Sequence, residues 1–393
     1  MNSLSVGFPR MHKEPGEVRD FLPRLIHRLS PLAREVVVEE GSGAGVGIDP
    51  QKYVRGCDNV HFGTHQECYD QDIVVQVRSP EDEELERMKP GTILFAMLHY
   101  PTHPSRVRRM HDLGLLPISM DSVVDEDGTR LIENIRGTSW NAVWAGFRAL
   151  RKTYPALESP EREPLRAVVM GTGPVGRYAA ESATKYGDVA LHLDLLAHDV
   201  PGVVVNLIGR NVTRHQRHLR ALLERADVFV DATFRADPTR FIVPNALVGA
   251  LPQHAVVVDA TADPYITDTD PIQVKAIEGI PTGDLDDYEF SPDHPAFDRL
   301  PPAVSTENRR LTVSCYSWPG LKPVECMRRY GRQLYPFLQI LLRRPFETLV
   351  DSQSYFEAAL YRGTLNHYLE EEQRGFYHRA AATGAIFREG EGS

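Results

Sequence analysis

Short apolar runs alternate with polar, helix-like stretches over residues 1–135. The runs are SLSVGFP, REVVVEE, DIVVQV, TILFAML and GLLPISM. Runs of this length are typical of buried strands, and their alternation with helical segments indicates an α/β layer with a mostly parallel sheet. The next stretch, SWNAVWAGFRALRKTYP, has apolar residues at helical spacing, and the proline-containing ALESPEREPLR after it indicates a linker.

A second alternating unit begins with AVVMGTGPVGRYAAESATKYG and continues to about VVVDATADPYI. From Ser291 the chain becomes irregular, and helical patterns resume near Glu325. The charged, amphipathic segments that follow are expected either to pack on the first domain or to form a subunit contact. The pattern therefore predicts two α/β layers followed by helices.

Length, charge and cysteine content narrow the class of protein. The 393 residues are too many for one ordinary core, and 42% hydrophobic with 25% charged residues is typical of a globular protein. A net charge of −10 gives no electrostatic reason to expect nucleic acid or an anionic membrane as a partner. The four cysteines form no CxxC pair, so neither a metal site nor a disulfide framework is expected: Cys57, Cys68, Cys315 and Cys326. With no signal-like or 18-residue apolar segment, we expect a cytoplasmic protein without a membrane partner.

A glycine-rich turn lies between an apolar strand and a helix at the start of the second unit. Gly171, Gly173 and Gly176 have the G-x-G-x-x-G spacing, with Pro174 and Val175 inside it. The first glycine permits the tight turn, the second lets the backbone approach a pyrophosphate, and the third lets helix and strand pack closely. In this strand–turn–helix setting, the motif predicts a dinucleotide site formed by residues 171–176.

Two alternatives for the next strand lead to different cofactors. In the first, DVALHLD is the strand and Asp194 binds the ribose, which suits NAD. In the second, GVVVNLIGRN is the strand, residues 187–201 are an insertion, and Arg210 and Asn211 follow the strand. We favour the second, because VVVNLI is the stronger β signal and the first leaves no room for a crossover helix. Arg210 and the arginines after it then favour NADP(H), without excluding NAD(H).

The run TILFAML ends on His99, and two interpretations are open for this histidine. It is either a core histidine hydrogen-bonded to the backbone, or an acid/base at the carboxyl end of a parallel strand, where α/β folds place their chemistry. Together these patterns predict an α/β protein in which a Rossmann-type domain (141–304) is inserted in a discontinuous substrate domain (1–140 and 305–393).

Four stretches resemble one family over roughly residues 5–340. They are VGFPRMHKEPGEVRDFLP, DIVVQVRSPEDEELERMKPGTILFAMLH, AVVVDATADP and CYSWPGLKP. The chain resembles the alanine dehydrogenase / pyridine nucleotide transhydrogenase superfamily. The segment VVDEDGTRLI and the short helix after Arg210 look more like the branch of lysine-forming saccharopine dehydrogenases and N5-(carboxyethyl)ornithine synthase.

The resemblance implies roles for individual residues. Arg19 falls on the arginine that holds the substrate carboxylate, His99 on the catalytic histidine, and Asp263 on the aspartate beside the nicotinamide and the substrate amine. Ser317 and Trp318 stand where the family has Asn-Met, so Ser317 is placed beside the cofactor. Trp318 is expected either to form a wall of the substrate pocket or to belong to the core.

Arg78 departs from the family, which has a lysine at this position. A lysine can lose its proton in a tuned site, whereas arginine stays charged. We therefore expect Arg78 to anchor a carboxylate or polarise a carbonyl, and proton transfer to depend on His99.

The resemblance implies an NAD(P)-dependent oxidoreductase that acts on the C–N bond of an amino acid. The reaction is either reductive amination of a 2-oxo acid or reduction of a saccharopine- or opine-type imine, with the reverse oxidation. The substrate is a small amino acid or 2-oxo acid, and a homo-oligomer is possible. The alternative is a catalytically retired homologue that binds NADP(H) or an amino acid as a sensor.

Overall fold

The computed structural model describes residues 4–11, 14–235, 237–261 and 263–373. The described residues form two compact units, one from the ranges 4–11, 17–134 and 323–373, the other from 14–16 and the described part of 135–322. The inserted arrangement is as predicted, but the boundaries at 140/141 and 304/305 are not. Helix α6 (Ile135–Thr153) packs as a whole in the second unit, and β12 (Leu311–Ser314) pairs with a strand of the second sheet.

The first unit contains a six-stranded parallel sheet in the order β3-β2-β1-β4-β5-β6. Its strands are β1 Val6–Phe8, β2 Val36–Glu39, β3 Val60–Gly63, β4 Ile73–Val75, β5 Ile93–Ala96 and β6 Leu116–Ser119. All but β3 lie in the predicted apolar runs. Strand β3 (VHFG) is an edge strand with an exposed His61, so its sequence carries no continuous apolar signal.

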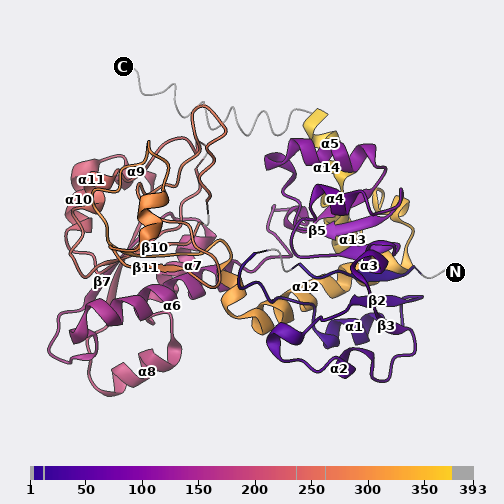
Figure 1. The fold of residues 1–393 in the computed structure, drawn as a ribbon, viewed down its shortest axis with the longest axis horizontal. Helices are drawn as coiled ribbons and strands as arrows, with labels where there is room; N and C mark the ends of the chain where they lie inside the picture. Colours follow the sequence, from indigo (N-terminus) through magenta and orange to yellow (C-terminus); the bar gives the residue numbers. More distant parts are fainter. Residues whose placement is uncertain (1–3, 12–13, 236, 262, 374–393) are drawn as a thin grey trace. The chain divides into compact units, whose positions relative to one another are not determined.

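Helices cover both faces of this sheet (Figure 1). One face packs against α1 Pro23–Leu29, α12 Pro323–Arg343 and α13 Tyr355–Arg362, and the other against α3 His65–Tyr69, α4 Asp82–Leu85, α5 Pro104–Asp112 and α14 Leu365–Gln373. The short α2 Gln51–Val54 lies beside α1 and β3. Consecutive residues of a strand point to opposite faces, and in the central strands β1, β4 and β5 the side chains on both faces are buried.

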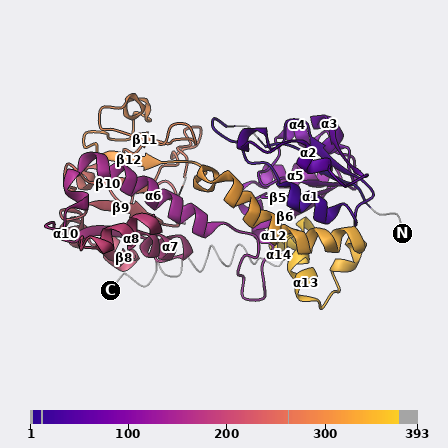
Figure 2. The same ribbon diagram turned by 90° about the horizontal axis from the view of Figure 1, so that it is seen from below.

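The carboxyl-terminal helices pack on the first unit. Helix α13 lies beside α12 and α14 (Figure 2). Between α13 and α14, Thr364 forms a bridge with Ile118, and the Ser119 amide donates to the carbonyl of Gly363 at 2.7 Å. The first of the two expectations for these segments is therefore confirmed.

The second unit contains a six-stranded sheet in the order β11-β12-β10-β9-β7-β8, parallel except for β11. Its other strands are β7 Leu165–Met170, β8 Val203–Ile208, β9 Val228–Asp231, β10 Val256–Asp259 and β11 Glu289–Phe290. Helices α6 and α7 Pro174–Ala183 cover one face, and α10 Gln216–Leu223 and α11 Asn245–Val248 the other (Figure 1). The turn between β7 and α7 is the predicted glycine-rich turn.

The second of the two strand alternatives is correct. Strand β8 pairs with β7 in parallel, with Met170 opposite Ile208. Asp194 lies instead on α8 Val189–Ala197, the helix formed by the predicted insertion. Asp188 caps this helix, because its carboxylate accepts the amides of Ala190 and Leu191.

Candidate functional site

Two of the three glycines of the turn, Gly171 and Gly176, have a geometric reason to be glycine, and the third, Gly173, borders open space. Gly171 has a φ of +116°, and a Cβ there would lie 2.3 Å from the Ala232 carbonyl oxygen. A Cβ on Gly176 would lie 1.8 Å from the Gly171 oxygen, whereas one on Gly173 would meet no atom within 4 Å. The turn is therefore tight at its first glycine, packed at its third, and open at its second.

Arg210 and Asn211 lie beside this turn. Both belong to α9 (Arg210–Thr213), which starts directly after β8, next to β7 at the edge of the sheet. A Cβ on Gly209 would lie 3.4 Å from Thr172 of the glycine-rich turn and 3.3 Å from the Asn211 side chain. Arg210 is exposed. The end of the second strand thus presents a cation and an amide next to the turn, the position that reads the adenosine ribose in such folds.

In the first unit, His99 follows β5 at the carboxyl edge of the sheet. Its backbone is left-handed, with a φ of 48°, and its side chain is 49% exposed. The Nδ1 atom lies 3.1 Å from Oδ2 of Asp121, and the His99 amide donates to Oδ1 of the same carboxylate at 3.2 Å. His99 is therefore not a buried core histidine, and its ring is held by a carboxylate. A strained backbone of this kind is common at functional sites.

Asp121 is a residue that the sequence reasoning missed. It follows β6, the parallel neighbour of β5, and the Ser119 hydroxyl also donates to its carboxylate at 2.6 Å. Burial alone would raise the pKa of Asp121, but the hydrogen bonds and charge of His99 and the Ser119 bond outweigh burial and hold this pKa well below its usual range. The sequence did contain one signal for Asp121: it lies two residues after the end of β6, which forms from an apolar run, and β6 pairs with β5, the strand before His99.

The two predicted carboxylate-binding arginines have different surroundings. Arg78 follows β4, next to β5, and is half-buried. Arg19 is 3% exposed, and its Nε donates to Oε1 of Glu17 at 2.9 Å. Burial opposes the charge of Glu17, but the Arg19 hydrogen bonds and then the charges of Arg19 and Arg78 give a net lowering of the Glu17 pKa. Arg19 is thus buried against Glu17, whereas Arg78 is the more exposed of the two cations.

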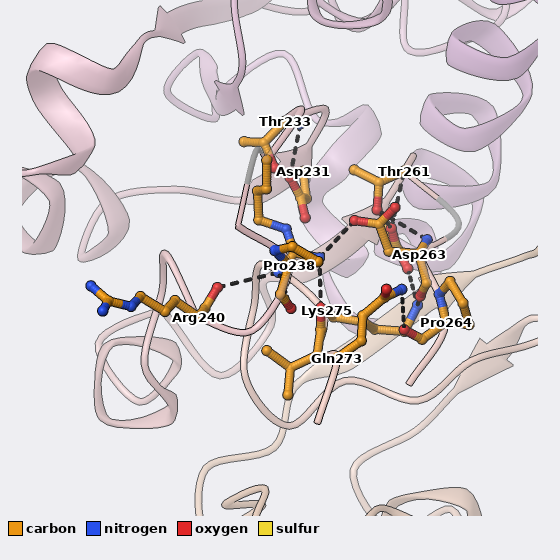
Figure 3. A network of polar contacts seen from close by, with 12 residues as sticks. Asp231, Thr233, Pro238, Arg240, Thr261, Asp263, Pro264, Gln273 and Lys275 are labelled. Atoms are coloured by element: carbon orange, nitrogen blue, oxygen red, sulfur yellow. Dashed lines mark hydrogen bonds and ion pairs between the residues drawn. The ribbon is translucent and has the colours of Figure 1, made fainter. Parts of the chain in front are cut away.

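The second unit has a polar network at the carboxyl ends of β9 and β10, where the sequence DAT occurs twice (Figure 3). Asp231 Oδ1 accepts the amide and hydroxyl of Thr233, and Asp259 Oδ1 accepts those of Thr261. The two aspartates are register partners on neighbouring strands, so both side chains lie on the same face of the sheet.

Lys275 neutralises one of these two aspartates. It is fully buried, and its Nζ lies 2.6 Å from Asp259 Oδ2 and 2.7 Å from the Asp263 carbonyl oxygen. Burial would raise the pKa of Asp259, but the charge and hydrogen bond of Lys275 outweigh burial, and the pKa is lowered. The second oxygen of Asp231 has no hydrogen-bond partner among the described residues. Burial, and then the Asp259 charge, raise the pKa of Asp231 to about 7.

Asp231→Asn is expected to remove a loss of stability between pH 4 and pH 7. In the wild type, Asp231 has a pKa of about 7 when folded and an ordinary value of 3.8. The folded state therefore binds the extra proton, and this contribution to stability, full below pH 4, is lost by roughly 1 kcal/mol per pH unit as the pH rises towards 7. Asn accepts the same Thr233 bonds and does not titrate. Denaturant midpoints at pH 5 and 8 measure the difference.

The exposed Asp268 in the same unit provides the matched control. Asp268→Asn is expected to follow the wild-type pH dependence. If Asp231→Asn also follows it, the assignment of a proton to buried Asp231 is wrong.

Asp263, the predicted partner of the substrate amine, is engaged by an arginine. Its side chain is 36% exposed, and Oδ2 accepts a hydrogen bond from Arg235 at 2.7 Å. Arg235 also donates to the carbonyls of Pro238, Arg240 and Val274 and is 5% exposed at its side chain. The Asp263 carboxylate is therefore accessible to solvent, but it already forms an ion pair with the buried side chain of Arg235.

Trp318 and Ser317 lie on the loop after β12. Trp318 is 1% exposed, packs in the core of the second unit, and donates its indole N–H to the Asp259 carbonyl at 2.7 Å. A side chain so covered cannot line a substrate pocket, so the structure favours the core alternative over the substrate-binding role. Ser317 is half-buried, and its amide donates to Cys315 Sγ at 3.4 Å; its predicted contact with a cofactor stays a prediction.

Neither a metal cluster nor a membrane helix is found in the described part of the chain. No group of three or more potential ligand side chains is placed to hold a metal ion there. Over the same residues, no helix is long and apolar enough to cross a membrane.

The sequence of this chain is similar to those of alanine dehydrogenases. Residues 13–133 match the model of the alanine dehydrogenase/PNT N-terminal domain. An alanine dehydrogenase of Mycobacterium tuberculosis is 24% identical over 275 residues, which cover 66% of this chain and 73% of that protein. One of Methanococcus maripaludis is 23% identical over 315 residues, covering 77% and 82%.

Solved structures show the same fold. An L-alanine dehydrogenase matches with a TM-score of 0.65 at 19% identity, covering 92% of this chain and 94% of that one. A transhydrogenase from Sinorhizobium meliloti matches with a TM-score of 0.56 at 18% identity, covering 86% and 94%. The chain therefore has the two-domain fold of alanine dehydrogenase, with a Rossmann-like second unit.

Proposed function

We propose that this protein is an NAD(P)-dependent amino acid dehydrogenase. The observation that carries the proposal is the pair of His99 and Asp121, because it provides an oriented acid/base in the domain that matches the alanine dehydrogenase/PNT model. A carboxylate that accepts Nδ1–H fixes the tautomer of the imidazole and leaves Nε2 to exchange a proton with a substrate.

The second unit fits a nicotinamide dinucleotide. The open space above Gly173, the tight turn at Gly171 and the close packing at Gly176 are what a bound pyrophosphate requires. Residues 171–176 would hold the phosphates, with Arg210 and Asn211 at the ribose. The bound dinucleotide supplies hydride transfer to or from the amino acid Cα, and the chain supplies binding and orientation.

The chain's own groups divide the remaining tasks. Arg78 holds the substrate carboxylate by charge-assisted hydrogen bonds. Arg19, which is paired with Glu17, is the second cation proposed for carboxylate binding. His99 takes or gives the proton at the substrate nitrogen or oxygen. Asp263 stabilises positive charge on the substrate amine, to the extent that Arg235 leaves its carboxylate available.

The finer proposals concern the cofactor and the amine. Arg210 at the end of β8 supports NADP(H) over NAD(H). The motifs around VVDEDGTRLI support condensation of a 2-oxo acid with the amine of a second amino acid, as in saccharopine and carboxyethylornithine formation, over reaction with ammonia. The expected substrate is a small amino acid or 2-oxo acid.

One observation favours the second candidate function, a sensor without turnover. The Glu17–Arg19 and Arg235–Asp263 ion pairs engage two of the groups that the reaction needs. A panel of 2-oxo acids, each assayed with NADPH and NADH and with no amine, ammonia or an amino acid as donor, separates the candidates. Oxidation of the reduced cofactor that requires the amine supports the enzyme. Cofactor binding without turnover across the panel supports the sensor.

Arg78→Lys is expected to raise the substrate KM about tenfold while lowering kcat less. The lysine keeps the charge but loses the planar, two-point contact with a carboxylate, which is part of substrate binding and not of the proton transfer. Steady-state kinetics with the best substrate of the panel measure both constants. A variant that is faster than wild type with alanine or pyruvate would instead indicate a proton-transfer role at this position.

A further inference from the structure

Four arginines converge on a small cavity in the first unit that none of the predicted site residues lines. The cavity has a volume of about 110 Å³ and lies between α1 and α12. Its lining consists of two parts: Leu22, Leu25, Met327 and Gly331 form the apolar part, and Arg24, Arg28, Arg328 and Arg332 form the charged part. Within each helix the two arginines are four residues apart, so they lie on one helix face.

Among the described residues, no carboxylate neutralises these four cations. All four are exposed, and in the part of the chain that the structure describes no carboxylate lies within ion-pair distance of them. Arg329 of the same helix shows the contrast, because it pairs with Glu133. Like charges at this spacing destabilise a helix, and here they gather in a chain whose net charge is −10. The cavity is therefore electrostatically complementary to an anion.

Arg28 is partly ordered before any ligand arrives. Its guanidinium lies over the Tyr335 ring, 3.3 Å from the ring centroid. Stacking restrains the plane of the guanidinium and leaves its N–H edge available for hydrogen bonds, which lowers the entropy cost of binding an oxyanion.

The volume limits what the cavity encloses. About 110 Å³ is the space of roughly three or four water molecules, smaller than the roughly 300 Å³ or more of a pocket that encloses a whole small ligand. One ring or alkyl group fits against the leucines and Met327, while charged groups remain outside on the arginines. Four like charges also oppose a symmetric contact with a second copy of this face.

We propose that the groove between α1 and α12 binds an organic polyanion that carries a flat ring with apolar faces, the chemistry of a nucleoside di- or triphosphate. The ring occupies the apolar depression, and the phosphates lie on the arginine pairs of the two helices. The proposal concerns a site of the first unit and does not depend on the dehydrogenase activity.

ATP, tripolyphosphate and adenosine are the probes, each titrated by calorimetry into the full-length protein with and without NADPH. ATP is expected to bind at low ionic strength whether or not NADPH is present, tripolyphosphate more weakly, and adenosine weakest. Raising the ionic strength from about 0.05 M to about 0.3 M should weaken ATP binding, because exposed charges are screened. Absence of ATP binding at low ionic strength overturns the proposal.

Two variants test the two halves of the groove. Arg24→Ala/Arg328→Ala should weaken ATP binding about tenfold or more, whereas the matched exposed pair Arg55→Ala/Arg108→Ala should leave it unchanged. Gly331→Leu fills the depression, since a Cβ there lies 3.6 Å from Leu25 Cβ without a clash. It should lower ATP affinity to that of tripolyphosphate and leave tripolyphosphate unaffected.

The remaining results would overturn the proposal. If wild type and Arg24→Ala/Arg328→Ala bind ATP with equal affinity, ATP does not bind in this groove. If Gly331→Leu binds ATP as tightly as wild type, the ring of ATP does not occupy the depression. Circular dichroism and thermal melting of each variant confirm folding. Poly-glutamate is a further probe, and tighter binding of it than of ATP would assign the groove to acidic peptides instead.

Discussion

His99→Gln is expected to lower kcat by about 100-fold or more while the Kd of the cofactor stays nearly unchanged. Glutamine keeps a polar side chain of similar reach but cannot exchange a proton. The imidazole of His99 is half exposed and held by Asp121, whereas the glycine-rich turn that would bind the dinucleotide belongs to the other unit. Steady-state kinetics and fluorescence titration of the cofactor measure the two quantities.

Two further substitutions make this result specific. Asp121→Asn should also lower kcat, because an amide in place of the carboxylate no longer favours the Nδ1–H tautomer or stabilises the imidazolium. The exposed His61 of β3, in the same unit, serves as the control, so His61→Gln should retain wild-type turnover. Full activity in His99→Gln would contradict the assignment of the acid/base.

Arg210→Ala is expected to remove most of a preference for NADP(H) over NAD(H). A charge-assisted bond to the 2′-phosphate contributes about 1.5–3 kcal/mol, which corresponds to roughly a tenfold to hundredfold preference in the wild type. The reason for choosing Arg210 is its position at the end of β8, beside the glycine-rich turn. Fluorescence titration of wild type and variant with both reduced cofactors gives the four dissociation constants.

Asp194 is the control for this experiment, because it belongs to helix α8 and not to the second strand. Asp194→Ala should therefore leave both affinities unchanged. Tighter binding of NAD(H) by the wild type, with a loss only in Asp194→Ala, would mean that the carboxylate reaches the ribose after all. Equal affinities for the two cofactors in all three proteins would contradict the role of Arg210.

The alternation of apolar and polar residues was sufficient to predict the two α/β layers, because buried parallel strands need continuous apolar runs. It also predicted the position of β8 correctly, because the apolar run VVVNLI was a stronger strand signal than DVALHLD, the alternative that places Asp194 at the ribose. The domain boundaries were misplaced for a physical reason: α6 starts at Ile135, in a polar segment before its first apolar stripe, and β12 follows a long irregular stretch that gives no periodic signal.

The groups that complete each site could not be predicted from one segment. Asp121 orients His99 from the end of the neighbouring strand, and Lys275 neutralises Asp259 from an irregular segment 16 residues further along the chain. Arg19 donates a hydrogen bond to Glu17, which is only two residues away. The sequence shows that the two residues are close along the chain, but not that both side chains are buried and paired with each other. Trp318 shows the same limit, because its burial follows from the packing around β10.

Transfer of deuterium tests the dehydrogenase assignment most directly. NADPH and NADH deuterated at nicotinamide C4, each as both C4 epimers, are incubated with the protein, a panel of 2-oxo acids, and either ammonia or an amino acid as amine donor. Mass spectrometry then locates the label in the product. The dehydrogenase assignment predicts deuterium at the Cα of a new amino acid or secondary amine, formed only when the amine is present and about 100-fold more slowly by His99→Gln. Unlabelled products across the panel, or labelled 2-hydroxy acids formed without an amine, would contradict it.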